Sequence, residues 1–249
     1  MNKVYLVGAG PGDPELLTLK GRRVLAIADS VLYDHLANDA LLEHAPPEAE
    51  RIYVGKKKAV HSHPQEEIIQ MMIDRARRGL NVVRLKGGDP FIFGRGGEEI
   101  EALAEAGIAY EVVPGITSPL GIAAYTGVPL THREHTSVVT FVTGHDLEHV
   151  DWSKFAISET LVIFMGLHFI AEITRELLKA GRPSDTPAMA VRWGTRPDQH
   201  TVVGTVATLP QMIEAHHLTP PATIIIGDVV SLRDKLTWFE KLPLFGKKI

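Results

Sequence analysis

Short apolar runs alternate with amphipathic stretches along the first half of this chain of 249 residues. Apolar runs bounded by Gly or polar residues predict buried strands, and an apolar repeat of three and four residues predicts a helix. The strands predicted in this half cover residues 4–7, 31–33, 51–54, 82–85 and 110–113. Helices are predicted over 66–78 and 97–106, the second ending before Gly107, a suitable C-cap. This alternation indicates a parallel sheet with right-handed crossovers.

The second half has a different order of elements. Its predicted strands cover residues 138–142, 161–164, 188–192, 201–206 and 223–226. A helix predicted over 170–178 ends near Gly181. The short, Gly-containing link after residue 192 indicates antiparallel pairing of the two strands that flank it. The stretch 114–132, rich in Gly, Pro and Thr, connects the halves and has a helical pattern at 120–125.

These patterns predict two α/β domains. We expect a parallel-sheet N-terminal domain at 1–115, a connecting segment at 116–135 and a mixed-sheet C-terminal domain at 136–249. A small-molecule site is expected in the cleft between the domains, where such sites commonly lie.

Composition narrows the class of protein. Hydrophobic residues make up 45% of the chain and charged residues 22%, which is typical of a globular protein. No run of about twenty apolar residues predicts a membrane span, and no secretory signal precedes the first strand. The absence of cysteine excludes disulfides, zinc–thiolate sites, iron–sulfur clusters and thiol catalysis. We therefore expect a cytoplasmic protein.

The net charge of −4 argues against a general nucleic-acid binder, which needs a broad basic face. Two basic clusters stand out, at residues 56–58 and 75–78. The second lies on a predicted helix and is most simply solvated surface. An anionic ligand would have to be held by local charge, because the overall field weakly repels it.

The loop after the first strand, residues 8–13, reads Gly-Ala-Gly-Pro-Gly-Asp. A dinucleotide fingerprint needs glycine where Asp13 stands, and that carboxylate would lie near any bound phosphate. A nicotinamide-dependent oxidoreductase is therefore disfavoured. The three glycines allow either a plain tight turn or close approach to a ligand.

The loop at residues 86–99 reads Lys-Gly-Gly-Asp-Pro-Phe-Ile-Phe-Gly-Arg-Gly-Gly-Glu-Glu and joins a strand to a helix. It therefore lies at the carboxyl edge of the sheet, where ligands bind in open α/β folds. Glu98 and Glu99 suit a helix N-terminus for purely structural reasons. Arg95, between two glycines, is better explained by carboxylate binding.

Further Gly- and Pro-containing loops lie at 113–118, 127–133, 164–166, 192–195 and 220–223, and Thr-Gly-His stands at 143–145. In order along nearly the whole chain, these loops resemble the tetrapyrrole methyltransferase family. The Gly-Asp-Pro loop running into Phe-Gly-Arg-Gly resembles its uroporphyrinogen-methylating members more than those acting later on the corrin path. The resemblance implies C-methylation of uroporphyrinogen III at C2 and C7 to precorrin-2, for sirohaem or cobalamin biosynthesis, by a homodimer.

The resemblance also implies S-adenosylmethionine bound between the domains. The matching cofactor positions are Pro11, Gly87, Gly88, Asp89, Ile92, Thr117, Ser118, Met165, Gly194 and Ala222. The positions implicated in substrate handling are Arg95, Glu98, Arg133 and Met165. A carboxylate such as Asp89 could attract the cofactor's positive charge.

Asp34 matches the position that the family assigns as proton acceptor, and Lys56 the proton donor. From the residues alone, the favoured interpretations are structural: Asp34 as a strand-end cap and Lys56 as a surface lysine. Lys56 could also bind a substrate carboxylate without taking part in catalysis.

The histidine pairs at 61/63 and 145/149 hint at a metal, but the ligands are too few and no metal is expected. A methylase of the same fold acting on a later corrin intermediate stays open, as does, less favoured, a non-catalytic anion-binding protein.

Overall fold

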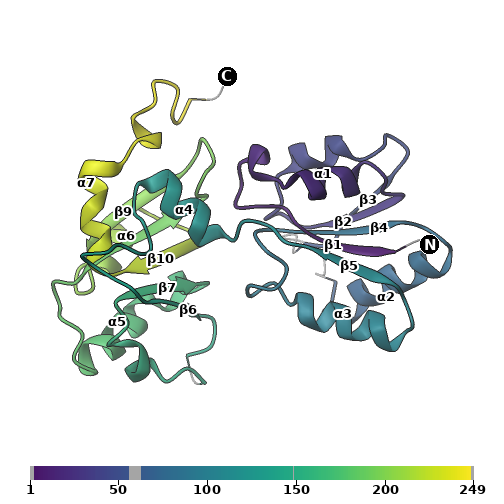
Figure 1. The fold of residues 1–249 in the computed structure, drawn as a ribbon. Coiled ribbons are helices and arrows are strands. Elements are labelled where there is room, and N and C mark those ends of the chain that lie inside the picture. Colours follow the sequence, from purple (N-terminus) through teal and green to yellow (C-terminus); the bar gives the residue numbers. More distant parts are fainter. Residues whose placement is uncertain (1–2, 56–62, 148, 248–249) are drawn as a thin grey trace. The chain divides into compact units, whose positions relative to one another are not determined.

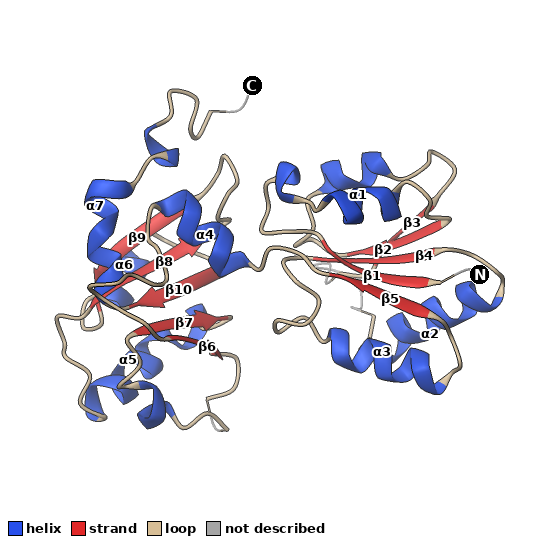
Figure 2. Cartoon of the chain, viewed as in Figure 1, coloured by secondary structure: helices blue, strands red, loops and turns tan. Residues whose placement is uncertain are grey.

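The computed structural model describes residues 3–55, 63–147 and 149–247. The chain forms two compact units, Met1–Ser118 and Pro119–Ile249, and each is described by itself. Each contains one five-stranded sheet with helices packed against it (Figures 1 and 2). The predicted pair of α/β domains, one with a parallel and one with a mixed sheet, is confirmed.

The sheet of the N-terminal unit is entirely parallel, as predicted, in the order β3-β2-β4-β1-β5. Its strands are β1 Val4–Gly8, β2 Ser30–Tyr33, β3 Glu50–Tyr53, β4 Val82–Lys86 and β5 Tyr110–Val113. Every predicted strand of this half is present within about one residue, because a parallel sheet covered on both faces needs near-continuous apolar runs.

The helices of this unit are α1 Leu19–Leu25, α2 Gln65–Arg77 and α3 Gly96–Glu105. Helix α1 covers one face of the sheet, and α2 and α3 cover the other (Figure 1). Side chains alternate along a strand, so Val83 and Leu85 pack toward α1 while Val82 packs toward α2 and α3. Gly107 follows α3 at φ +69°, which confirms its predicted role in ending the helix.

The sheet of the C-terminal unit is mixed, in the order β6-β7-β10-β8-β9. Its strands are β6 Val139–Thr143, β7 Thr160–Phe164, β8 Pro187–Arg192, β9 His200–Thr205 and β10 Ala222–Ile226. Only β6 and β7 pair in parallel, and the predicted antiparallel pairing of β8 with β9 is confirmed.

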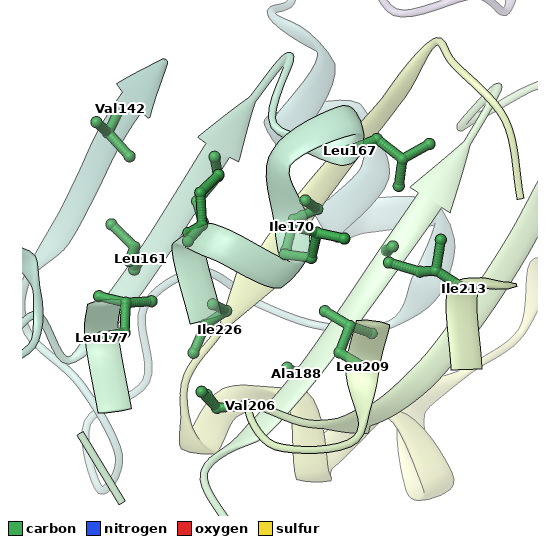
Figure 3. Packing of buried hydrophobic residues seen from close by; sticks show 14 of the residues in the cluster. Val142, Leu161, Leu167, Ile170, Leu177, Ala188, Val206, Leu209, Ile213 and Ile226 are labelled. Carbon is green, nitrogen blue, oxygen red and sulfur yellow. The ribbon is translucent and has the colours of Figure 1, made fainter. Parts of the chain in front are cut away.

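The helices of the second unit are α4 Ser118–Thr126, α5 Ile170–Lys179, α6 Leu209–Ala215 and α7 Arg233–Leu236. Apolar side chains of α5 and α6, among them Leu177 and Leu209, pack with Leu161 and Ile226 of the sheet in the larger core cluster (Figure 3). Ile122 of α4 belongs to the cluster on the opposite face. Among the described residues no helix is long and apolar enough to cross a membrane.

The C-terminal segment is tied to β9 by a partly buried carboxylate. Glu240 accepts hydrogen bonds from Gln199 Nε2 at 2.8 Å and Thr201 Oγ1 at 2.7 Å, and it also pairs with Arg233. Burial raises the pKa of Glu240, but the hydrogen bonds from Thr201, Gln199 and Arg233 outweigh it and hold the pKa below its ordinary value. The folded unit therefore favours the ionised form of this group.

Candidate active site

The parallel sheet brings the predicted site residues of the N-terminal unit to one edge. Pro11 follows β1, Asp34 directly follows β2, Gly87 follows β4, and Thr117 follows β5 after a short loop. All of these strands run the same way, so the loops at their carboxyl ends share the edge where open α/β sheets bind ligands. Lys56 lies outside the described residues.

The glycine loops at this edge touch one another through their backbones. The Gly88 N–H donates to Gly10 O at 2.7 Å, and the Gly10 N–H donates to Gly88 O at 3.2 Å. A Cβ on Gly115 would lie 2.3 Å from Gly88 O and 2.7 Å from Gly8 Cα. Gly88 itself has φ +66°, a conformation that favours glycine. Contact between loops is therefore a sufficient reason for these glycines, besides the tight turn or the approach to a ligand that the sequence allows.

Asp89 joins two of these loops. Its Oδ1 accepts from the Phe91 N–H at 2.8 Å, and its Oδ2 accepts from the Gly115 N–H at 3.0 Å. Both carboxylate oxygens thus hold backbone, one in the loop after β4 and one in the loop after β5. Ile92, a few residues on, is partly exposed.

Asp34 is also held on both oxygens. Its Oδ1 accepts from the Leu36 N–H at 3.0 Å, which forms a local turn of the kind Asp favours. Its Oδ2 accepts from Arg84 Nη2 at 3.2 Å. The side chain keeps about a fifth of its surface exposed, 20%, so the carboxylate can still meet a ligand.

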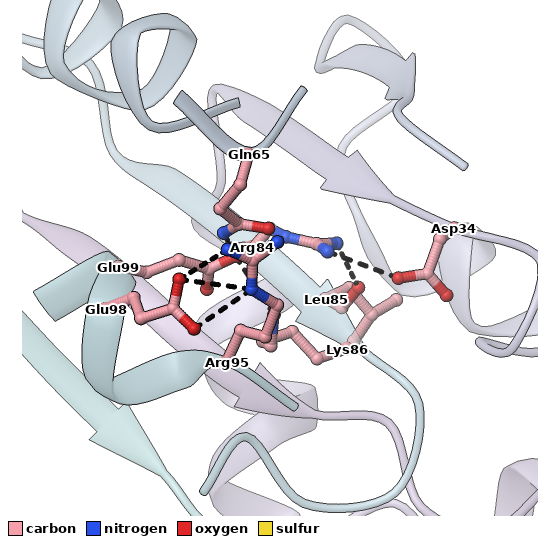
Figure 4. Close-up of polar contacts among 8 residues, drawn as sticks. All are labelled: Asp34, Gln65, Arg84, Leu85, Lys86, Arg95, Glu98 and Glu99. Carbon is pink, nitrogen blue, oxygen red and sulfur yellow. Dashed lines mark hydrogen bonds and ion pairs between the residues drawn. The ribbon is translucent and has the colours of Figure 1, made fainter. Parts of the chain in front are cut away.

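Asp34 is connected through Arg84 to a group of buried charged side chains, which the sequence did not predict (Figure 4). Glu99 Oε1 accepts from Lys86 Nζ at 2.9 Å, from Arg84 Nε at 3.3 Å and from Gln65 Nε2 at 2.9 Å. Burial lowers the pKa of the Lys86 ammonium, as does the Arg84 charge, while Glu99 opposes the shift. Two cations spaced two residues apart in an apolar strand were the available signal, because buried cations need a buried anion.

Arg95 has a carboxylate partner in its own chain. Its Nε donates to both oxygens of Glu98, at 3.0 and 3.1 Å, and Nη2 donates to Oε2 at 2.5 Å (Figure 4). These bonds raise the pKa of Arg95 and lower the pKa of Glu98. Arg95 has φ +58° at the start of α3, and both side chains are about half exposed. Glu98 thus binds the Nε–Nη2 edge of the guanidinium in the bidentate geometry that arginine–carboxylate pairs favour.

In the C-terminal unit, three predicted residues meet at one edge of the mixed sheet. Thr223 pairs with Phe164, and Ala222 pairs with Arg192. Met165 follows β7, Gly194 follows β8 after Trp193, and Ala222 begins β10, so antiparallel pairing brings them to the same edge. Met165 and Trp193 have φ of +53° and +48°, a strain that clusters at functional sites.

Gly194 packs against α4, and Arg133 lies on the surface. A Cβ on Gly194 would lie 2.3 Å from Ile122 Cγ1, so packing on α4 already requires glycine there. Arg133 is exposed in the turn bounded by the His132–Thr136 bridge. Within the described part of the chain, no group of three or more His, Cys, Asp or Glu is arranged to hold a metal ion.

The fold and this loop arrangement define a class of protein. Residues 3–210 match the family model of tetrapyrrole (corrin/porphyrin) methylases. The chain belongs to this family.

Two solved methyltransferases are similar to this chain over most of its length. The uroporphyrin-III C-methyltransferase of Thermus thermophilus, solved with S-adenosylhomocysteine, is 42% identical, with a TM-score of 0.80 over 93% of this chain and 100% of that one. A cobalt precorrin-4 methyltransferase is 32% identical, with a TM-score of 0.82 over 92% of this chain and 95% of that one.

Sirohaem synthases match most of this chain but little more than half of their own. That of Chromobacterium violaceum is 52% identical over 96% of this chain and 52% of its own length. That of Azotobacter vinelandii is 50% identical over 96% of this chain and 53% of its own. The chain thus spans about half the length of the curated relatives it matches.

Proposed function

We propose that the chain transfers methyl groups from S-adenosylmethionine to C2 and C7 of uroporphyrinogen III, giving precorrin-2 by way of precorrin-1. The observation that carries the proposal is the likeness, across 93% of the chain, to a uroporphyrin-III C-methyltransferase. Such a reaction needs a cation that binds the substrate's carboxylates and a base that accepts a proton. Arg95, paired with Glu98, is proposed as the first and the partly exposed Asp34 as the second.

The residues proposed for S-adenosylmethionine fit such a ligand. At the edge of the parallel sheet they are Pro11, Gly87, Gly88, Asp89, Ile92, Thr117 and Ser118, and in the mixed sheet Met165, Gly194 and Ala222. The first set offers small residues and backbone groups in loops fixed by Asp89 and by the Gly10–Gly88 bridge. Asp89 acts mainly by holding these loops, and its charge adds attraction for a cation.

When bound, S-adenosylmethionine supplies an electrophilic methyl group on a sulfonium. A ring carbon of the reduced tetrapyrrole is the nucleophile: its π electrons form the new carbon–carbon bond, the carbon–sulfur bond breaks and S-adenosylhomocysteine leaves. The ring is then cationic and returns to neutrality by losing one proton. Asp34 is the proposed acceptor of that proton, and Lys56 a donor or a carboxylate ligand.

Substrate carboxylates are proposed to bind the guanidinium groups of Arg95 and Arg133, with Glu98 and Met165 in contact with the substrate. Glu98 fixes the guanidinium through Nε and Nη2, so the substrate carboxylate is proposed to bind at the edge formed by Nη1 and Nη2. Positioning and charge placement supply most of the catalysis, since no enzymic nucleophile is required.

The test is an anaerobic assay with methyl-labelled S-adenosylmethionine and enzymically generated uroporphyrinogen III. Label in a dimethylated tetrapyrrole supports the proposal. Asp34→Asn and Arg95→Met should each lower the rate by about 100-fold, whereas the exposed controls Asp39→Asn and Arg77→Met should not. Cofactor binding without transfer would remove the substrate assignment and leave a later corrin intermediate to be assayed. No cofactor binding would remove the whole proposal.

We further propose a cytoplasmic homodimer. Light scattering of the purified protein at about twice the monomer mass supports the dimer, and a monomer of full activity contradicts it.

A further inference from the structure

The middle strand of the N-terminal sheet carries two cations into the interior. Arg84 and Lys86 lie on the same face of β4 as Val82, because side chains alternate along a strand. Both side chains are only 6% exposed. Charges so buried are costly unless they are paired and hydrogen-bonded.

One buried carboxylate serves both cations. Glu99, fully buried on α3, accepts through Oε1 from Arg84 and Lys86, and also from Gln65. Its Oε2 has no hydrogen-bond partner within the described residues. With Glu99 as sole anion the two cations would be undercompensated, and Asp34 is the second anion bonded to the group.

Arg84 therefore connects a rigid interior to the edge of the site. Its Nε is held by Glu99, its Nη1 donates to Leu85 O at 3.0 Å, and its Nη2 reaches Asp34 Oδ2 at 3.2 Å. A planar guanidinium fixed at two points leaves its third direction fixed as well. Asp34, at the end of this chain of contacts, keeps 20% of its side-chain surface exposed, against 6% for Arg84 and 0% for Glu99.

We propose that Arg84, braced by Glu99, is a positioning residue that fixes the carboxylate of Asp34 in the orientation needed to accept the proton released after methylation. The inference rests on the proposed function and deepens it. Arg84 touches no substrate, since its side chain is buried, and acts entirely through Asp34.

A plain stabilising ion pair makes different predictions. If the pair only stabilises the fold, its removal changes the free energy of unfolding and leaves kcat of the folded enzyme unchanged. If Arg84 positions Asp34, removing Arg84 lowers kcat with little change in KM, and this effect disappears once Asp34 can no longer act as a base. The catalytic effects of the two residues then become non-additive.

The experiment is a double-mutant cycle on the full chain with Arg84→Met, Asp34→Asn and the double variant. Arg84→Met should lower kcat by about 100-fold, the scale expected for a misplaced catalytic group. In the Asp34→Asn background it should lower kcat no further. Arg84→Lys, which keeps the charge without the fork, should recover part of the rate.

The matched control is Arg75→Met. Arg75 donates through Nε and Nη2 to the two oxygens of Glu50, both at 2.8 Å, where β3 begins at the opposite edge of the sheet. Its loss should leave kcat unchanged in the folded enzyme. Equal losses of kcat in both variants would show a general effect of ion-pair removal and overturn the inference.

A second cycle measures unfolding and needs no substrate. In this cycle the folding equilibrium constant of the double variant should differ by about fivefold or more from the value expected when the two single-variant factors are multiplied. If Arg84→Met does not fold, Arg84→Lys takes its place in both cycles. Additive rate effects in an active enzyme, or no coupling in unfolding, overturn the inference. If the unfolding cycle shows the coupling but the wild-type chain transfers no methyl group, the proposed function is overturned instead.

Discussion

Gly115→Ala should damage the edge of the parallel sheet through one added methyl group. The new Cβ would lie 2.3 Å from Gly88 O, 2.7 Å from Gly8 Cα and 2.8 Å from Gly8 C. All three are backbone atoms, so no side chain can turn aside to make room. Overpacking of this kind costs about 1–3 kcal/mol. Loss of the Gly115 N–H bond to Asp89 would add about 1.5–3 kcal/mol, because the acceptor is charged.

We therefore expect a loss of about 2.5–6 kcal/mol in the unfolding free energy of the N-terminal unit. The assay is urea unfolding followed by far-ultraviolet circular dichroism. All three tryptophans of the chain, at positions 152, 193 and 238, lie in the C-terminal unit. Their fluorescence therefore reports on that unit and serves as an internal reference.

Two other glycines separate lack of space from backbone strain. Gly107 has φ +69° and no atom within 4 Å of its added Cβ, so Gly107→Ala should cost only the left-handed conformation, about 1–2 kcal/mol. Gly97 lies in α3 with open space around its Cβ, and Gly97→Ala should stabilise the helix by about 0.5–1 kcal/mol. Gly115→Ala with wild-type stability and wild-type S-adenosylmethionine affinity would refute the packing argument.

Three further predictions concern buried charge. Glu240→Gln should lower the free energy of unfolding by about 1–3 kcal/mol at pH 7, measured by urea unfolding. Because folding lowers the pKa of Glu240, this difference from wild type should shrink as the pH falls from 4.5 through the lowered pKa. Folding also lowers the pKa of Lys86, so the charge of Lys86 costs stability at neutral pH, and this cost is relieved as the pH rises toward 10.5. Over this alkaline range, wild type should therefore gain stability relative to Lys86→Met. The opposite trend would contradict the assignment. Arg182→Met should cost about 2 kcal/mol, because the main-chain carbonyls of Ala156 and Ser158 lose their buried donor, whereas exposed Arg175→Met should cost little by calorimetry.

The strands were predictable because each buried strand is a short run of mostly apolar residues in the local sequence. The run Val-Val-Arg-Leu-Lys at 82–86 is apolar enough to fix a central strand, and its ends agree with the prediction to one residue. Helix α1 was not predicted. It has only seven residues, contains Gly21 and exposes Leu19, so its apolar spacing is weak. Helix α6 also has seven residues and was not predicted, because it is too short for a clear apolar repeat.

The site was predictable only as a set of loops. Gly115 and Gly88 are far apart in sequence, and nothing local shows that each is glycine because the other's backbone lies against it. The two adjacent glutamates of α3 show the same limit. Glu98 is half exposed and pairs with Arg95, whereas Glu99 is fully buried beneath Arg84 and Lys86.

By itself the sequence determined the alternation of elements, the two α/β domains, the glycine loops at strand ends and, through the order of those loops, the family. These follow from local periodicity and from residue types with few alternatives, such as glycine at positive φ. The tertiary structure alone decided which charges are buried together and which oxygens of Asp34 and Asp89 are already occupied. Those facts depend on how α3 is rotated against the sheet and how separate loops pack, and a helix turns its face by about 100° at each residue.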